Sequence, residues 1–400
     1  KKVLKFMEKH GKICFKIINK GRDFIMKKRL LSLLLVVAFV FALVACGNTA
    51  SETDGEKETV KATKMTMGTG GTAGTYYGYG GVLGQYIKNK AGIEVTVVST
   101  DGSKANIQGI DAGNYQLGTV QSDVMAYAWE GTRAFEEDGK VESFRVVAGL
   151  YAEAVQLVTM DPNIKSVADL KGKKVSIGAP ASGVYFNAMD VLDAAGIKLE
   201  EITPQYQNFD ESADALKDGK IDAAFIVAGA PTPAITELSM TNDNVRIVPI
   251  DGDIATKLMN DNTFYSVYKI PANTYKNQTE EVTTVTVKAT LIVDANASED
   301  DVYNLTAAIF DNMEDIAKEN AKGAELSLEN ATDGMTVPFH AGAAKYFKEK
   351  GKQFYQEHKE ELKIKHREYY QKNKEKLREE YRRRKEQKNG NLLSEKQRTS

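Results

Sequence analysis

A short apolar strand, a loop of small residues and a helix follow one another at two places in the chain, and this repeat constrains the fold most. In the first, a strand over 64–67 leads into the stretch 68–77 and a helix over about 76–90. In the second, a strand over 174–177 leads into the loop 178–183 and another helix. Such loops present backbone N–H groups at the carboxyl ends of strands, where ligands bind in open α/β sheets. Two modules of this kind that face each other would form a cleft.

Strand and helix patterns alternate through the rest of the body, which is typical of an α/β fold with a largely parallel sheet. Two separate strands are predicted over 145–150 and 155–160, near a point where the chain could cross between lobes. A long helix is predicted over 299–320. A body of about 300 residues is long enough for two lobes that each have a hydrophobic core.

An export signal begins at Met26 rather than at the first residue. Three basic residues follow Met26, and then comes an apolar run over 30–45 that ends at Cys46. This order is typical of a secretory signal peptide, and the run is shorter than the roughly 20 apolar residues that span a bilayer. We therefore predict a signal peptide over 26–45, with an uncleaved membrane anchor as the alternative.

The residues before the predicted cut, Leu43-Val44-Ala45-Cys46, look like a lipobox, the pattern at which bacterial signal peptidases cut ahead of a cysteine that becomes lipidated. Cys46 is the predicted lipidation site. The other cysteine is Cys14, so a mature chain that begins at Cys46 has no partner for an internal disulfide. Residues 46–62 are otherwise polar and free of aromatics, which predicts a flexible tether. We interpret residues 1–25 as an upstream extension that need not be translated in the cell.

Charge is divided sharply along the chain. Residues 1–46 have a net charge of +9, residues 346–400 of +8 and the body over 47–345 of −19, within a formal total of −2. An acidic body argues against binding to nucleic acid and against direct adsorption to anionic lipid. We therefore expect no nucleic-acid partner.

The glycine- and threonine-rich stretch 68–77 is the strongest candidate for a ligand site. Glycine lets the backbone approach a ligand closely, threonine adds hydroxyl donors, and tyrosine offers a flat wall with a polar tip. Residues 68–73 also fit the dinucleotide pattern G-x-G-x-x-A. An exported protein has no dependable nicotinamide supply, so no cofactor is predicted. A loop that merely turns the chain is the structural alternative.

Two other polar stretches lie where predicted strands end. Ser182, in the second small-residue loop, could cap the following helix or donate to a ligand, and both roles stay open. Gln121-Ser122-Asp123 begins another helix. Asp123 is well placed as an N-cap, whereas Gln121 has less structural reason to be there.

Sequence patterns of catalysis are missing. Of the four histidines only His340 lies in the body, and the chain has no Gly-x-Ser-x-Gly, no His-Glu-x-x-His and no cysteine and histidine cluster. We therefore predict that the protein is not an enzyme and holds no metal.

Seven motifs then occur in a fixed order through residues 63–351. They are GTGGTAGTYYG (68–78), STDGS (99–103), QSD (121–123), GAPASG (178–183), AGAPTP (228–233), IPANTY (270–275) and VPFHAGA (337–343). Together they resemble the TAXI family, the solute-binding subunits of tripartite ATP-independent periplasmic (TRAP) transporters. The resemblance implies an α/β, two-lobed periplasmic-binding-protein fold of type II with a ligand cleft between the lobes. Lobe I would comprise about 63–155 and 264–351, and lobe II about 156–263.

The resemblance also implies a function. The cleft would close on a small organic acid or amino acid, typically glutamate or glutamine, and the loaded protein would dock on a sodium-driven TRAP permease, outside the cell membrane and held there by its lipid. A ligand-sensing lipoprotein of the same fold and an exported enzyme are the alternatives. Ligand contacts carry over to Thr69, Gly70, Thr75, Tyr76, Thr100, Gln121, Ser122, Ser182, Gly183, Pro231 and Thr232.

Arginine is scarce in the body. Arg133, Arg145 and Arg246 are the only three, and none lies in a matched motif. A bidentate arginine clamp, the usual device for a carboxylate, is therefore not expected. We hypothesise that backbone N–H groups and Thr or Ser hydroxyls at helix N-termini hold the carboxylate of the ligand.

Residues 352–400 lie beyond the resemblance. They are rich in Glu, Lys and Arg, with an apolar residue near every seventh position, which predicts a solvated basic helix. A weak coiled coil, contact with anionic lipid and a gene fusion are the alternatives.

Overall fold

The structure is a computed structural model and describes residues 63–357. Residues 1–25, the predicted signal peptide, Cys46, the whole tether up to residue 62 and the tail beyond residue 357 lie outside the described residues, so what the sequence predicts for them stays a prediction. No helix within 63–357 is both long enough and apolar enough to cross a bilayer.

The strands of the described residues join in one sheet in the order β2-β1-β3-β10-β4-β7-β5-β6, with β8 beside β4 and β9 beside β10. They are β1 (Lys64–Gly68), β2 (Glu94–Val98), β3 (Leu117–Gln121), β4 (Phe144–Thr159), β5 (Lys174–Ser176), β6 (Thr203–Gln205), β7 (Ala223–Ala228), β8 (Arg246–Val248), β9 (Ser266–Ile270) and β10 (Val282–Asp294). Pairing is parallel among β1, β2 and β3 and among β5, β6 and β7, but β4 and β10 run antiparallel to every neighbour. The sheet is therefore mixed, not largely parallel as we expected.

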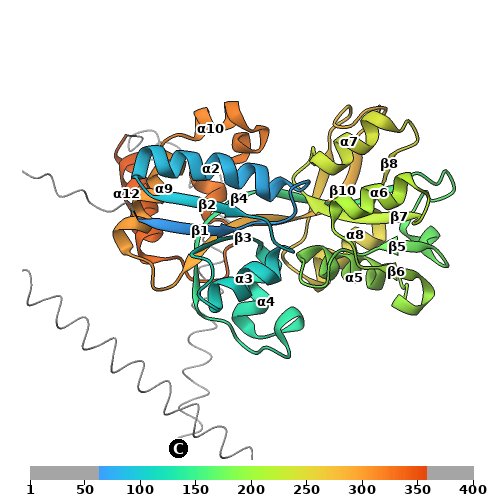
Figure 1. The fold of residues 1–400 in the computed structure, drawn as a ribbon, viewed down its shortest axis with the longest axis horizontal. Helices are drawn as coiled ribbons and strands as arrows, with labels where there is room; N and C mark the ends of the chain where they lie inside the picture. The colour runs from blue at the N-terminus through green and yellow to red at the C-terminus, as the bar shows by residue number, and fades with distance from the viewer. Residues whose placement is uncertain (1–62, 358–400) are drawn as a thin grey trace, which may run out of the picture. The chain divides into compact units, whose positions relative to one another are not determined.

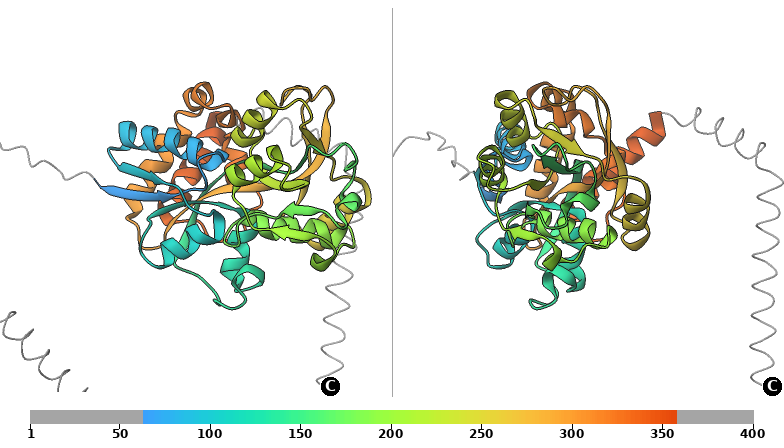
Figure 2. Two further views of the ribbon diagram at one scale, coloured as in Figure 1. Left: turned by 45° about the vertical axis from the view of Figure 1, so that its right-hand side comes forward. Right: turned by 90° about the vertical axis from the view of Figure 1, so that its right-hand side faces the viewer.

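Helices cover both faces of this sheet (Figure 1). The α-helices are α2 (Thr75–Ala91), α3 (Ser103–Asp111), α4 (Ser122–Glu130), α5 (Gly183–Ala194), α6 (Phe209–Lys217), α7 (Pro233–Thr241), α8 (Gly252–Asp261), α9 (Glu299–Phe310), α10 (Met313–Glu319), α11 (Leu328–Thr332) and α12 (Ala341–Glu357). The 3-10 helices are η1 (Arg133–Phe135), η2 (Val167–Leu170), η3 (Leu199–Glu201) and η4 (Ala321–Glu325). In the turned views of Figure 2, α2 stays on one side of the strands β1 to β3, and α3 and α4 stay on the other.

The strands β4 and β10 cross the whole body. β4 has 16 residues, and it pairs with β10 over its first part and with β7 over its last. We predicted two separate strands, over 145–150 and 155–160, with a gap over 151–154. The gap does not exist, since Glu153 is buried and its backbone pairs with Val287 of β10.

Two sets of core clusters lie at opposite ends of these crossing strands. In lobe I, α2, α9 and α12 pack on one face of the sheet and α3 and α4 on the other. In lobe II, α5 and α8 pack on one face and α6 and α7 on the other. This is the two-lobed, type II architecture that the resemblance implies, with two strands as the crossings.

The chain returns to lobe I later than expected. Tyr265, Ile270 and Tyr275 lie in the range we assigned to lobe I, yet they are buried in the core of lobe II. β9 pairs with the first part of β10, so the return crossing runs along β10 itself. The predicted helix over 299–320 is also divided, because α9 ends before Asn312, whose side-chain amide donates to the carbonyl of Ala308.

Helix α2 shows how the local sequence builds lobe I. Tyr79, Leu83 and Ile87 recur every four residues and are fully buried. They therefore form one apolar stripe, and Leu83 and Ile87 each contribute about 1.5–3 kcal/mol by burial. The helix ends at Gly92, whose φ of 71° is a left-handed conformation that glycine adopts without strain. The glycine loop before Thr75 is thereby attached to a rigid element.

Gly342 should be intolerant of a side chain. A Cβ at Gly342 would lie 2.2 Å from the carbonyl oxygen of Glu299 and 2.6 Å from the amide nitrogen of Tyr303, both backbone atoms of α9. We expect Gly342→Ala to lower the free energy of unfolding by about 1–3 kcal/mol, because α12 would have to move away from α9. Urea unfolding followed by circular dichroism measures this change. Gly351→Ala, on the same helix in open space, is the control and should be neutral or stabilising; equal losses for both would contradict the packing argument.

Candidate ligand-binding site

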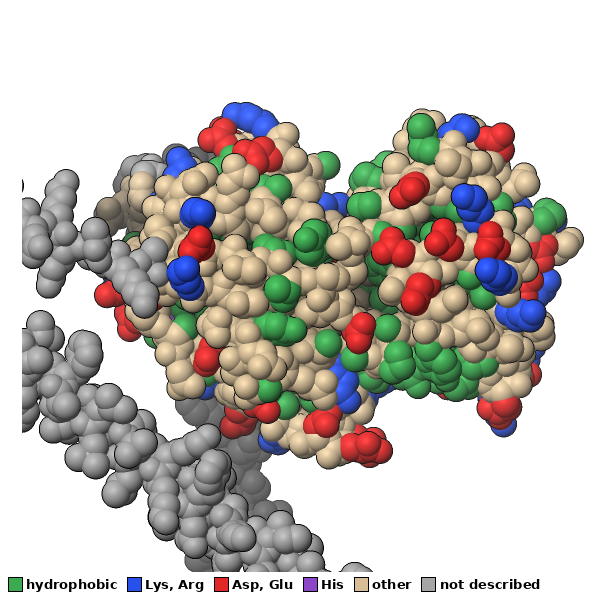
Figure 3. Space-filling view, in the orientation of Figure 1, with side chains coloured by type: hydrophobic (Ala, Val, Ile, Leu, Met, Phe, Trp, Pro, Cys, Tyr) green, Lys and Arg blue, Asp and Glu red, His purple; other side chains and the backbone are tan. Residues whose placement is uncertain are grey.

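A pocket lies between the two lobes and encloses about 590 Å³ of empty space, part of it open to solvent. Figure 3 shows the notch between the lobes on the face seen in Figure 1. Lobe I contributes Gly70, Gly71, Gly74, Thr75, Tyr76, Thr100, Asp101, Gly102, Ser103 and Gln121 to the lining, β4 contributes Glu153, and lobe II contributes Gly178, Ala179, Ser182, Gly183, Val184, Gln207, Asn208, Phe209, Val227 and Ala228.

The N-termini of four helices reach this pocket, those of α2, α3, α5 and α6. α5 and α6 have capping side chains, since Ser182 accepts from the amide of Tyr185 and Asn208 from that of Glu211. α2 and α3 follow Gly74 and Gly102 and have no side-chain cap. Their first-turn N–H groups can therefore donate to an anion, and the positive ends of their dipoles favour one. No lysine or arginine is among the lining residues.

Acceptor groups gather elsewhere in the pocket. Glu153 is buried on β4 and accepts a 2.6 Å hydrogen bond from the hydroxyl of Tyr76. Burial raises the pKa of Glu153 to about 8, although the hydrogen bond from Tyr76 and the charge of Lys322 oppose the shift. The side-chain oxygens of Gln121 and Gln207 are buried without a partner. The site thus has a donor side, formed by helix N-termini, and an acceptor side, formed around Glu153.

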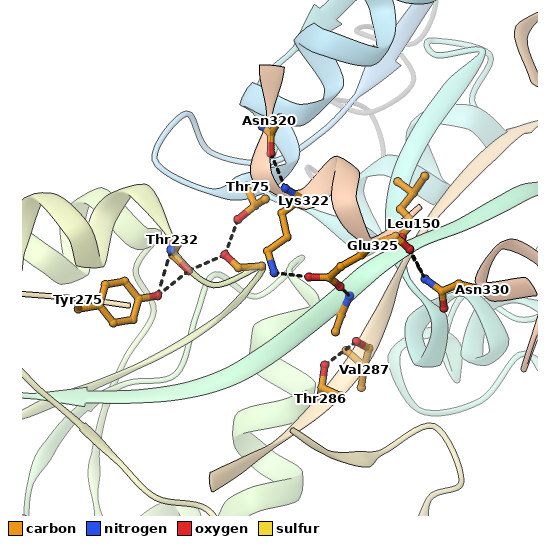
Figure 4. A network of polar contacts seen from close by, with 12 residues as sticks. Thr75, Leu150, Thr232, Tyr275, Thr286, Val287, Asn320, Lys322, Glu325 and Asn330 are labelled. Atoms are coloured by element: carbon orange, nitrogen blue, oxygen red, sulfur yellow. Dashed lines mark hydrogen bonds and ion pairs between the residues drawn. The ribbon is translucent and has the colours of Figure 1, made fainter. Parts of the chain in front are cut away.

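The lobes touch directly at the edges of the pocket. The amide of Ala234 donates to the carbonyl of Ala73 over 3.1 Å, and the amide of Ala105 donates to the carbonyl of Ala181 over 3.2 Å. Figure 4 shows a third contact, in which the hydroxyl of Thr75 donates to the carbonyl of Gly229 in lobe II over 2.9 Å. The structure therefore shows the closed form of the cleft.

Most of the predicted contact residues line the pocket. They are Gly70, Thr75, Tyr76, Thr100, Gln121, Ser182 and Gly183. Ser182 was left open between capping and binding, and its hydroxyl does act as the N-cap of α5. As ligand contacts these seven residues remain predictions.

Four predicted contacts lie outside the pocket lining. Thr69 is buried and its hydroxyl donates to the carbonyl of Val98. Ser122 faces a second hollow behind the crossing strands, where its hydroxyl oxygen accepts from the amide of Lys288. Pro231 follows a cis peptide bond, and the hydroxyl of Thr232 donates to the carbonyl of Gly229. Here the motif residues build the loops rather than the walls of the pocket.

Sequence reasoning missed several lining residues, above all Glu153. The sequence does contain a feature that could have identified Glu153, since it is the single acidic residue inside the apolar run 146–158. A buried charge in a strand needs a partner or a function. Gln207 had no signal, since it belongs to no quoted motif. His340 is structural: its ring contacts the carbonyl of Ala297 and accepts from the amide of Gly342. Among residues 63–357 no three His, Cys, Asp or Glu side chains are grouped to hold a metal.

The fold and the pocket define a two-lobed α/β protein of the type II periplasmic-binding-protein architecture, with its candidate site between the lobes. The chain belongs to the NMT1-like family, whose model matches residues 67–351.

Solved structures similar to the chain come from binding proteins. The alkanesulfonate-binding protein of Xanthomonas axonopodis pv. citri bound to MOPS is 16% identical, with a TM-score of 0.42 over 72% of this chain and 84% of that chain. The periplasmic aliphatic sulphonate binding protein of Escherichia coli is 18% identical, with a TM-score of 0.38 over 74% and 93%. The GluR0 ligand-binding core with L-glutamate is 12% identical, with a TM-score of 0.40 over 67% and 98%.

Gly183 should be required for closure of the cleft. A Cβ on Gly183 in lobe II would lie 1.2 Å from the side-chain oxygen of Gln121 in lobe I. This clash exists only when the lobes meet, and moving the Gln121 side chain away would break its hydrogen bond to Asn187. Gly183→Ala should therefore reduce the ratio of closed to open molecules by about tenfold. The overall free energy of unfolding should change little.

Cross-linking across the cleft measures the closed population. In the full chain with Cys14→Ser and Cys46→Ser, the pair Ala105→Cys and Ala181→Cys would be joined by a short bismaleimide only when the lobes touch. Gly81→Ala, at an exposed position of α2 with open space around it, is the control. An unchanged cross-linking rate in Gly183→Ala would contradict the predicted clash.

Proposed function

We propose that the protein is an extracytoplasmic solute-binding lipoprotein. It captures a small amino acid or organic acid and delivers it to a TRAP-type sodium-driven permease. The observation that carries the binding role is the pocket between the lobes, with uncapped helix N-termini on one side and Glu153 on the other. Cys46, at the predicted lipobox, would anchor the chain to the outer face of the cytoplasmic membrane.

The donor side of the pocket suits a carboxylate. The first turns of α2 and α3 supply N–H groups, and Ser103 adds a hydroxyl close to them. Backbone donors at helix N-termini stabilise an anion without a counter-charge on a side chain. This agrees with the absence of lysine and arginine from the lining residues.

The acceptor side suits a group that donates hydrogen bonds and carries positive charge. Glu153 is buried, so its ionised form is costly unless a cation pairs with it. The unpartnered oxygens of Gln121 and Gln207 also call for donors. An α-amino acid has a carboxylate and an ammonium group, whereas a second carboxylate would meet Glu153 unfavourably. Within the proposed class, an amino acid therefore fits better than a dicarboxylate.

The delivery step is supported by the ordered motifs of the TAXI resemblance, which run through the whole body. The resemblance also gives the cleft a reason to close fully, because a transporter must distinguish the loaded form from the empty one. The membrane partner and the lipid anchor are part of this proposal.

A ligand screen tests the binding role. The full chain is heated with each of a panel of L-amino acids and of dicarboxylates, and the unfolding temperature is recorded. A ligand at 100 times its dissociation constant should stabilise the protein by about 2.7 kcal/mol. We expect amino acids to raise the unfolding temperature and succinate or malate to have less effect. If no small acid stabilises the chain, the proposed function is wrong.

Glu153→Gln tests the acceptor side of the pocket. The change keeps shape and removes the charge, so affinity for an amino acid should fall by at least about tenfold, because a hydrogen bond to a charged group contributes about 1.5–3 kcal/mol. Isothermal titration calorimetry with the best amino acid of the screen measures this loss. Glu142→Gln, an exposed glutamate just before the same strand, is the control. Unchanged affinity in Glu153→Gln would show that the ammonium group is held elsewhere.

A further inference from the structure

Asn187 makes an unusually complete set of contacts across the cleft. It lies on α5 of lobe II and is fully buried. Its amide nitrogen donates to the carboxylate of Asp123 over 2.9 Å and to the hydroxyl of Tyr265 over 2.8 Å. Its side-chain oxygen accepts from the amide of Gln121 over 2.8 Å. Asparagine is a poor helix former, so these contacts are its reason to be there.

The two lobe I partners of Asn187 are each incompletely bonded. Asp123 is in the first turn of α4 and fully buried, and its Oδ1 has no partner. The Oε1 of Gln121 also has none. A buried carboxylate with one unpaired oxygen is costly in its charged form and much less so when protonated. The cluster is thus suited to a neutral Asp123.

Cations near Asp123 are engaged elsewhere. Arg133 of η1 pairs with Asp190 of α5, and its guanidinium lies 5.2 Å from the ring of Tyr127. Lys288 of β10 donates to the carbonyls of Asn330 and Asp333. Among the described residues, no lysine or arginine is paired with Asp123 in an ion pair.

The remaining ionisable neighbours of Asp123 favour its neutral form. Asp190 and Glu153 are acidic, and Tyr127 and Tyr265 are phenols whose pKa values burial raises. Burial raises the pKa of Asp123 to about 7. The hydrogen bond from Asn187 opposes this shift, the charge of Asp190 adds to it, and hydrogen bonds from the backbone amides of Val124 and Asp123, in the first turn of α4, also oppose it.

We propose that Asn187 is the latch that holds the cleft closed, and that closure of the lobes places a proton on Asp123. Asn187 is a positioning residue in this role, because it acts by bringing the lobes together. The proposal concerns closure itself, so it does not depend on which ligand the pocket takes.

The direction of the pH effect follows from the two states of the cleft. In the open form Asp123 is in contact with water and ionises near its ordinary pKa of about 4. In the closed form its pKa is about 7. Closure therefore takes up a proton between these values. The closed form gains stability as pH falls from about 8 and gains no more below about pH 4, and the ratio of closed to open molecules should rise by about tenfold between pH 8 and pH 6.

The cross-linking pair Ala105→Cys and Ala181→Cys, in the full chain with Cys14→Ser and Cys46→Ser, provides a test that needs no ligand. Glu153→Gln is added as background, because Glu153 is the other fully buried carboxyl at the cleft. Each cross-linking rate is first corrected with the bismaleimide reactivity of the single-cysteine variants at the same pH. The corrected rate should be higher at pH 6 than at pH 8, by about tenfold where the open form predominates.

Three latch variants separate proton uptake from packing. Asp123→Asn mimics the neutral acid and should give fast cross-linking at both pH values. Asn187→Ala should give slow cross-linking at both. Asn187→Asp places a second carboxyl beside Asp123, so the decrease in its cross-linking rate relative to the parent should be larger at pH 8 than at pH 6. Asp253→Asn, an exposed first-turn aspartate of α8, should behave like the parent.

Each result bears on the proposal separately from the proposed function. A parent rate that does not change with pH, or an Asp123→Asn profile that matches the parent profile, would overturn the proton assignment. Parent-like closure in Asn187→Ala would overturn the latch. Urea unfolding of each variant shows whether a slow rate reflects an open cleft or a destabilised lobe. Failure of the ligand screen would leave these outcomes unaffected.

Discussion

Two strands, β4 and β10, serve both lobes at once, and the rest of the structure depends on how they do so. Their backbones pair with each other at the centre and with different strands at each end, so within the described residues the chain passes between the lobes along only these two strands. Side chains alternate across β4: Glu153 lines the pocket, and Ala152 faces the hollow on the other side. One acidic residue on the pocket side of a crossing strand therefore determines much of the chemistry of the cleft.

The N–H donors in the pocket must attract an anion although the body of the protein has a large negative charge. Residues 47–345 have a net charge of −19, which repels an anion at a distance. At physiological ionic strength this repulsion is screened beyond about 8 Å, whereas the N–H groups of a helix N-terminus act within the first turn. The first turns of α2 and α3 lie in the pocket, so an anion that enters the cleft is close to them and far from most surface carboxylates. An acidic protein can thus bind a carboxylate without a lysine or arginine in the site.

The sequence predicted the two strand, loop and helix modules but not how the strands connect the lobes. The strand, loop and helix at 64–90 and at 174–195 follow from local patterns, and the structure has them. The continuity of β4 was missed because Glu153 looks like a break in an apolar run, and only the neighbouring strand shows that it is buried within a ladder. Thr232 and Ser122 were taken as contacts because they lie in motifs, yet the direction of each side chain depends on the lobe packed against it. Gln207 lies in the pocket because of the order of the strands in the sheet, and no local sequence pattern encodes that order.

The two buried carboxyls give the cleft a physical reason to respond to its ligand. Closure without a ligand buries Glu153 and Asp123 together, and each must be protonated or pay for an unpaired charge. The amino acid that we propose as the ligand would change this for Glu153, because its ammonium group would lower the pKa that burial has raised and let the carboxylate stay ionised. Asp123 would have no such relief, because it is not among the residues that line the pocket. Loaded closure therefore requires one proton where empty closure requires two. That difference shifts the population towards closed lobes when the ligand is bound, since a ligand moves such an equilibrium only by its differential affinity for the two states.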